Sequence, residues 1–133
     1  MLSKSAVGSG VAFAVLALLL SACQTPPTVT SEARSTTYHV RLELDSASMG
    51  MRSAVINVTD SSAQPAAGRQ VTLSPAMPKM NMTGPSTVAN EVGPGRYEAH
   101  GEFFTMLGDW EITVKVTLGE TTEQVSFPVT AVP

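Results

Sequence analysis

The chain has 133 residues, enough for one domain, and its 8 Lys and Arg against 11 Asp and Glu give a formal net charge of −3. This charge offers no excess of cations for a phosphate backbone, so the composition argues against nucleic-acid binding. A single cysteine excludes an internal disulfide and cysteine-based zinc motifs, and two histidines are too few for a three-histidine metal site.

The N-terminal segment, residues 1–22, has the features of a lipoprotein signal peptide. Lys4 supplies a positive charge, and residues 11–20 are apolar over a length that suits a signal sequence and is too short to cross a bilayer. Residues 20–23 then read Leu-Ser-Ala-Cys, which resembles a bacterial lipobox. We therefore expect Cys23 to carry lipid and to hold the protein on a membrane.

The residues after the cysteine bear on the location of the protein. An Asp at this position usually signals retention in the inner membrane of Gram-negative bacteria. By that resemblance, Gln24 favours the outer membrane facing the periplasm if the source is Gram-negative. Residues 24–36 contain two prolines and few side chains that a core could bury. We predict that residues 23–36 are a flexible tether.

Residues 37–133 alternate between apolar and polar side chains almost throughout, the pattern of β-strands. About seven short strands are predicted, separated by turns that contain glycine or proline. Their ranges are 36–45, 53–60, 69–74, 86–92, 96–103, 109–118 and 122–130. No stretch has a helical period. We therefore predict an all-β fold, an immunoglobulin-like antiparallel β-sandwich.

The apolar positions of these strands form the predicted core, with Trp110 at the head of a strand. Its members are Tyr38, Val40, Leu42, Ile56, Val71, Leu73, Tyr97, Trp110, Ile112, Val114 and Phe127. In the strand at 86–92 the alternation puts Val88 and Val92 on the apolar face. Pro128 predicts that the last strand is an edge, because proline has no N–H to donate to a neighbouring strand.

Three segments together resemble one protein family. Residues 74–82 form a loop rich in Met and Pro, residues 93–99 contain Gly-x-Gly-x-Tyr, and residues 104–114 contain Met-x-Gly-x-Trp before an alternating strand. This combination is similar to the YtkA-like domain, and FixH proteins have a related pattern. The resemblance implies an immunoglobulin-like sandwich outside the cytoplasmic membrane, often found beside copper-handling or efflux components.

Methionine gives the strongest functional signal in the chain. Apart from Met1, every methionine falls in a connection between predicted strands: Met49, Met51, Met77, Met80, Met82 and Met106. If successive strands reverse direction, the first, third and fifth connections lie at the same end of the sandwich. We therefore expect the six methionines to share one end, the methionine pole, and we expect this pole to point away from the tether and the membrane.

Three interpretations of these methionines remain open. Thioethers are soft ligands that suit Cu(I), and Met80 and Met82, with Met77 or Met106, could bind it weakly. Met49 and Met51 would then be a secondary part of the pole. Alternatively, flexible methionines form an adaptable surface for a protein partner, or they simply pack. Residues 74–82 contain no histidine, which argues against a tight or Cu(II)-type site.

No arrangement of nucleophile and base is visible, so we expect no enzyme. The two histidines do not define a Ser/His/Asp triad. Glu98, His100 and Glu102 share one face of a strand, which is typical of a solvated surface and could at most hold a divalent cation weakly. We predict a non-enzymatic binding module with Cu(I) as the leading ligand. A metal-free interaction module for an envelope partner is the alternative.

Overall fold

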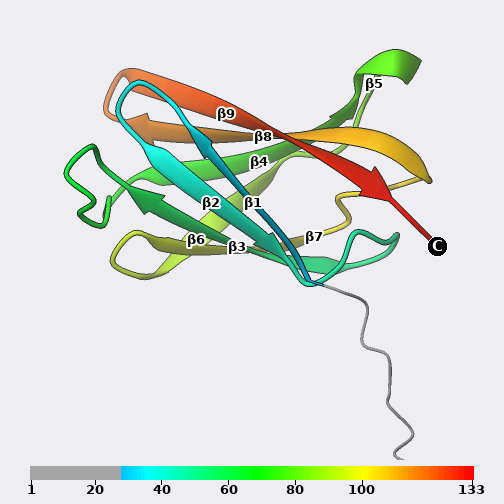
Figure 1. Cartoon of the computed structure of the whole chain (residues 1–133), viewed down its shortest axis with the longest axis horizontal. Coiled ribbons are helices and arrows are strands. Elements are labelled where there is room, and N and C mark those ends of the chain that lie inside the picture. Colours follow the sequence, from blue (N-terminus) through cyan, green and yellow to red (C-terminus); the bar gives the residue numbers. More distant parts are fainter. Residues whose placement is uncertain (1–27) are drawn as a thin grey trace, which may run out of the picture.

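The computed structural model describes residues 28–133, and its elements are β-strands apart from one short 3-10 helix (Figure 1). The strands are β1 (Val29–Arg34), β2 (His39–Leu44), β3 (Arg52–Thr59), β4 (Gln70–Met77), β5 (Met82–Thr83), β6 (Thr87–Gly93), β7 (Arg96–Gly101), β8 (Gly108–Leu118) and β9 (Thr121–Ala131), and the helix is η1 (Pro78–Met80). Within this part of the chain, no helix has the length and apolar composition needed to span a membrane.

The strands pair in the order β1-β2-β3-β7-β6-β4-β8-β9, with β5 beside β4, and each of these pairings is antiparallel. β6 joins two sheets, because Thr87, Val88 and Ala89 pair with β4 whereas Asn90 and Glu91 pair with β7. One sheet therefore contains β1-β2-β3-β7-β6, and the other contains β4-β8-β9 with β5 beside β4. Without the additional strands β1 and β5, the sheets are β2-β3-β7-β6 and β4-β8-β9. This is the strand order of an immunoglobulin sandwich, and it confirms the predicted fold class.

The core lies between the two sheets, and the alternation of the strands explains why. Each long strand turns its apolar face inward, and every residue of the predicted core is buried. Phe104 was outside the alternation, since β7 ends at Gly101, yet it is fully buried. Its ring meets that of Trp110 edge to face, with centroids 6.0 Å apart. β9 pairs only with β8 among the named strands, so Pro128 does lie on an edge.

Strand β6 is the place where the predicted apolar face is wrong. Val88 and Val92 are 56% and 52% exposed, whereas Ala89 between them is buried. β6 changes its partner from β4 to β7 within a few residues, and its register shifts between Glu91 and Gly93. A strand that crosses between two sheets in this way does not keep one face toward the core, so its alternation is a poor guide to burial.

The first strand lies where a tether was expected. Residues 29–34 form β1, which pairs with β2 from Val29 opposite Leu44 to Arg34 opposite His39. The prediction of a tether up to residue 36 is therefore wrong for these residues. Because β1 runs antiparallel to β2, the chain enters the sandwich at the end where β2 stops, next to the β2–β3 connection (Figure 1).

The Gly-x-Gly-x-Tyr segment builds a corner at the end of the sandwich opposite the methionines. The Tyr97 hydroxyl donates to the carbonyl oxygen of Ala66 at 2.7 Å and accepts from the backbone N–H of Arg69 at 3.0 Å. Gly95 has φ +69°, and a Cβ there would lie 2.7 Å from the carbonyl oxygen of Val58. This motif therefore has a structural role: it locks the β6–β7 turn onto the β3–β4 connection.

Candidate functional site

The six methionines lie at one end of the sandwich, the end that Figure 1 shows on the right. They lie between β2 and β3 (Met49, Met51), at the end of β4 and in η1 and β5 (Met77, Met80, Met82), and between β7 and β8 (Met106). The strand registers bring these segments to the same end. Leu44 pairs with Ala54, Ala76 with Glu111 near the start of β8, and Gly108 with Ala131.

This methionine pole lies at the end of the sandwich where β1 begins, so the prediction that it lies at the end opposite the chain's entry is wrong. Val29, the first residue of β1, is the partner of Leu44, the last residue of β2. The next residues after β2 lead directly to Met49. One additional strand before β2 reverses the end at which the chain enters, and the order of the later connections does not change.

One group of methionines, the β2–β3 group, consists of Met49 and Met51. Their side chains are 45% and 68% exposed. Beside them lies a mainly apolar groove, which we call the N-terminal groove; its apolar lining is Val29, Ala47, Met49, Val132 and Pro133. Polar contacts hold this connection in place: Arg52 Nη1 donates to Ser46 Oγ at 2.9 Å, and Val132 bridges with Ser48.

The other group, the β8 group, surrounds the start of β8 and consists of Met77, Met80, Met82 and Met106. Met77 is buried and stands directly opposite Met82 in the β4–β5 pair. The Met77 terminal methyl lies only 3.0 Å from where a Cβ of Gly108 would be, so glycine makes room for this thioether. Met80 and Met82 are 55% and 38% exposed, and Met106 packs partly against the core.

The two groups occupy different corners of the pole. In Figure 1, η1 and β5 project at the upper right, whereas the β2–β3 connection lies at the lower right. The four methionines of the β8 group therefore lie on neighbouring segments, and Met49 and Met51 form a separate surface. In the sequence the six methionines are alike, and only the three-dimensional arrangement separates them.

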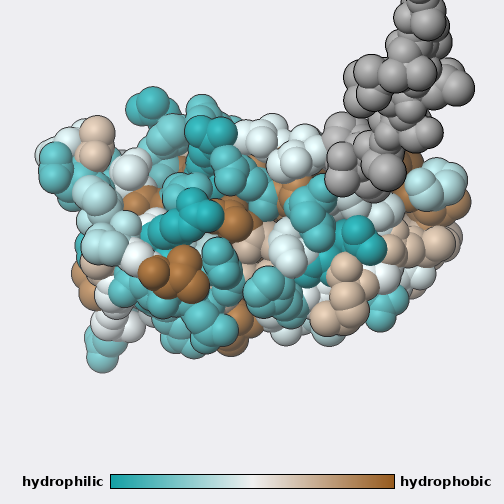
Figure 2. Space-filling model, turned by 90° about the horizontal axis from the view of Figure 1, so that it is seen from below, coloured by the Kyte–Doolittle hydropathy of each residue, from teal (hydrophilic) through white to brown (hydrophobic). Residues whose placement is uncertain are grey.

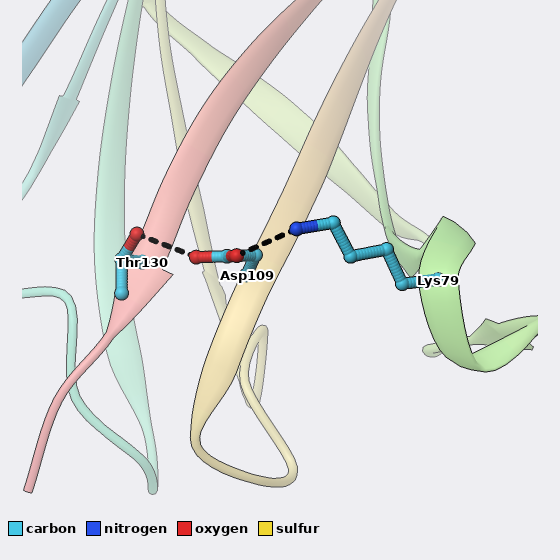
Figure 3. A network of polar contacts seen from close by, with 3 residues as sticks. All are labelled: Lys79, Asp109 and Thr130. Carbon is cyan, nitrogen blue, oxygen red and sulfur yellow. Dashed lines mark hydrogen bonds and ion pairs between the residues drawn. The ribbon is translucent and has the colours of Figure 1, made fainter.

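Figure 3 shows the polar contacts that tie η1 to the sandwich. Lys79 Nζ lies 3.2 Å from Asp109 Oδ2, and the hydroxyl of Thr130 donates to Asp109 Oδ1 at 2.9 Å. Asp109 therefore links η1 to β8 and β9. The residue after η1, Asn81, has φ +50°, and this sharp turn separates Met80 from Met82.

Comparison with known protein families identifies the domain. A family model described as YtkA-like matches residues 32–115. This chain belongs to the YtkA-like family. The match begins inside β1 and ends in β8, so it includes the three segments on which the resemblance was based. Comparison with curated proteins and with solved structures gave no match.

In this YtkA-like domain the three segments have different roles. The Gly-x-Gly-x-Tyr segment closes the corner opposite the pole. The Met-x-Gly-x-Trp segment supports the pole, since Trp110 Nε1 donates to the carbonyl oxygen of Met106 at 2.9 Å and Gly108 makes room for Met77. The Met- and Pro-rich loop supplies Met77, Met80 and Met82. Two segments are thus structural support, and the third carries the exposed thioethers.

The other candidate residues form no metal cluster in residues 28–133 or lie outside the described part of the chain, although His100, opposite Ser53, is near the end of β7 that reaches the pole. His100 Nδ1 lies 2.9 Å from Ser53 Oγ, and Glu98 lies 4.0 Å from Arg96. Within residues 28–133, no three or more His, Cys, Asp and Glu side chains come together as metal ligands. Cys23, the expected lipidation site, and the signal peptide lie outside the described residues.

We expect the Asp109 carboxyl to titrate below its ordinary pKa of 3.8. The Thr130 hydroxyl, followed by Lys79, stabilises the carboxylate and lowers its pKa. Because the pKa is lowered in the folded state, this network is intact above pH 3.8 and is lost as the pH falls through the lowered value. NMR titration should show the pKa rising in Thr130→Val and in Lys79→Met.

The matched control is Lys115→Met, which removes a lysine from β8, the strand that carries Asp109, and leaves the contacts of Asp109 with Lys79 and Thr130 in place. Its Asp109 pKa should equal that of the wild type. A wild-type Asp109 that titrates at or above 3.8 would contradict the contacts in Figure 3.

Proposed function

We propose that this YtkA-like protein is a lipid-anchored lipoprotein of the cell envelope and that its domain is a non-enzymatic binding module for Cu(I). The ion would be held weakly or transiently by the β8 group. The observation that carries this proposal is the Met77–Met82 pair, with Met80 and Met106 on the neighbouring segments. The lipobox at residues 20–23 supports the anchor.

The geometry of the pair suits a soft ion. Residues directly opposite in antiparallel strands project to the same face, with Cβ atoms about 5 Å apart. The thioethers of Met77 and Met82 can therefore approach one point without a change in strand pairing. Thioethers are neutral, soft donors that favour Cu(I) over harder cations. Met80 is exposed on η1, and a modest movement of this short element would add a third sulfur.

Cu(I) titration of the purified lipoprotein under reducing conditions, against a competing chelator, tests the proposal. Met80→Leu combined with Met82→Leu keeps bulk and apolarity but removes two sulfurs. We expect the affinity for Cu(I) to fall by about tenfold or more, which is about 1.4 kcal/mol.

The matched control is Met49→Leu with Met51→Leu, which removes two sulfurs from the other corner of the pole and should leave the affinity unchanged. Wild-type affinity in the Met80/Met82 double variant would show that these residues are not the ligands. The Cu(I) assignment would then be abandoned.

A metal-free interaction module for an envelope partner is the second candidate. It is favoured by the exposure of four methionines, Met49, Met51, Met80 and Met82, since flexible thioether side chains adapt to protein surfaces. The two functions differ in their response to substitution. Leucine would preserve an apolar partner surface, whereas it would remove copper ligands. Glutamine at the same positions would weaken both.

A further inference from the structure

Exposed apolar side chains gather at the methionine pole. Of the large hydrophobic residues that are exposed in residues 28–133, most belong to this end: Met49, Met51, Met80, Met82, Leu107 and Val132. The view in Figure 2 shows apolar residues at the right-hand end of the molecule, which is the pole in Figure 1, and further apolar patches on the left half. The β2–β3 group and the N-terminal groove form the part of this surface nearest to Val29.

The expected lipid anchor at Cys23 limits how far this surface can be from the membrane. Five residues, 24–28, separate Cys23 from Val29. Even a fully extended chain spans only about 3.3–3.6 Å per residue, so Val29 cannot lie more than about 20 Å from a lipid-bearing Cys23. The other end of the sandwich is farther away, because β8 crosses between the ends and a strand of its 11 residues is about 36 Å long.

The charges beside this surface show no positive excess, because Asp45, Glu102 and Asp109 accompany Arg52 and Lys79 at this end. Arg52 donates to Ser46, and Asp45 lies next to that serine in the chain. At the other corner Lys79 pairs with Asp109. Attraction to anionic headgroups would therefore add little, and contact with a membrane would depend mainly on removing apolar side chains from water.

We propose that Met49 and Val132, which line the N-terminal groove, and the exposed Met51 of the same β2–β3 connection rest in the interface of the lipid bilayer that holds the anchor. This inference rests on the proposed lipid at Cys23 and does not depend on copper. The occupant of the surface is the bilayer itself. The domain would then be held in a fixed orientation, with the β2–β3 connection against lipid and the Gly95 corner away from it.

The experiment uses the full-length lipoprotein reconstituted in phosphatidylcholine vesicles. A Met51→Cys variant carries an environment-sensitive fluorophore, since a lipidated Cys23 has no free thiol to react. The matched control is Leu118→Cys, which labels a similarly exposed apolar position at the far end of β8. For an apolar surface buried about 5–10 Å into the headgroup boundary, we expect nitroxide lipids to quench the label at position 51 at least about twofold more.

A second comparison tests the side chains themselves. Met49→Gln with Val132→Gln should reduce quenching of the Met51→Cys label, whereas Val92→Gln with Leu118→Gln at the opposite end should not. Adding anionic lipid should change little. Two results would overturn the inference. One is equal quenching of the labels at positions 51 and 118; the other is a label at position 51 that is shielded from water but is not quenched by the nitroxide lipids.

A missing lipid anchor can be detected independently of the membrane contact. Mass spectrometry of the purified protein shows whether Cys23 carries acyl chains. An unlipidated Cys23 would refute both the proposed anchor and the membrane contact, whereas a lipidated protein with an unquenched label would refute the contact alone.

Discussion

Replacement of Trp110 by alanine is expected to lower the free energy of unfolding by about 3–5 kcal/mol. The indole is only 2% exposed, its ring packs edge to face on Phe104, and its Nε1 donates to the carbonyl oxygen of Met106. Alanine would leave a cavity and an unpaired carbonyl. Since small domains are stable by only about 5–15 kcal/mol, this loss would threaten folding. Urea denaturation followed by circular dichroism measures it.

Trp110→Phe is the informative control for this substitution. Phenylalanine keeps most of the ring volume but cannot donate to Met106, so we expect a smaller loss, about 1–3 kcal/mol. The difference between the two variants separates cavity formation from the lost hydrogen bond. A Trp110→Ala variant as stable as the wild type would contradict the packing described between β8 and the β7–β8 connection.

The Cys23→Ser variant is expected to lose its lipid and to leave the membrane fraction. Acyl chains contribute about 0.8 kcal/mol per buried methylene, so losing all of them removes nearly the whole of the membrane affinity. Fractionation of cells, with mass spectrometry of the purified protein, is the measurement. Thr25→Ser, which leaves residues 20–23 intact, is the control and should fractionate as the wild type does.

A Cys23→Ser protein that stays in the membrane fraction as firmly as the wild type would refute the lipoprotein proposal. In this test, the proposed contact of Met49, Met51 and Val132 with the bilayer is not expected to keep the protein in the membrane fraction without the anchor. Such a small apolar surface gives weak, reversible binding, whereas attached acyl chains give durable binding.

Most of the strands could be predicted from the sequence because their inward faces are strongly apolar. In β8, for example, Trp110, Ile112, Val114 and Val116 alternate with polar residues, and all four are buried. β1 has no such signal. The inner positions of its burial pattern are Val29, Ser31 and Ala33, of which only Val29 is a sizeable apolar residue, and all three are only partly buried. Pairing with β2 stabilises this strand, and no local pattern reports that pairing.

Part of the candidate site could also be predicted, because the alternation of apolar and polar residues reveals the long strands. Counting strand reversals brings the six methionines to one end, because the order and direction of the long strands after β1 were predicted correctly. The bounds were not, since β4 extends through Met77 and Met82 lies in the unpredicted strand β5. The pairing of Met77 with Met82 could not be predicted, since β5 contains only two residues and has no periodicity. The end of the sandwich at which the chain enters could not be predicted either, because it depends on whether β1 exists.

In the proposed lipid-anchored protein, the additional strand β1 would decide which end of the domain is nearest to the anchor. An immunoglobulin sandwich whose first strand is β2 would join an N-terminal anchor at its Gly95 corner, and its methionines would face the aqueous compartment. One antiparallel edge strand of six residues, which among the named strands pairs only with β2, would invert this arrangement. A protein engineer could therefore turn the domain over by deleting residues 29–36 and joining the lipid attachment directly to the segment before β2.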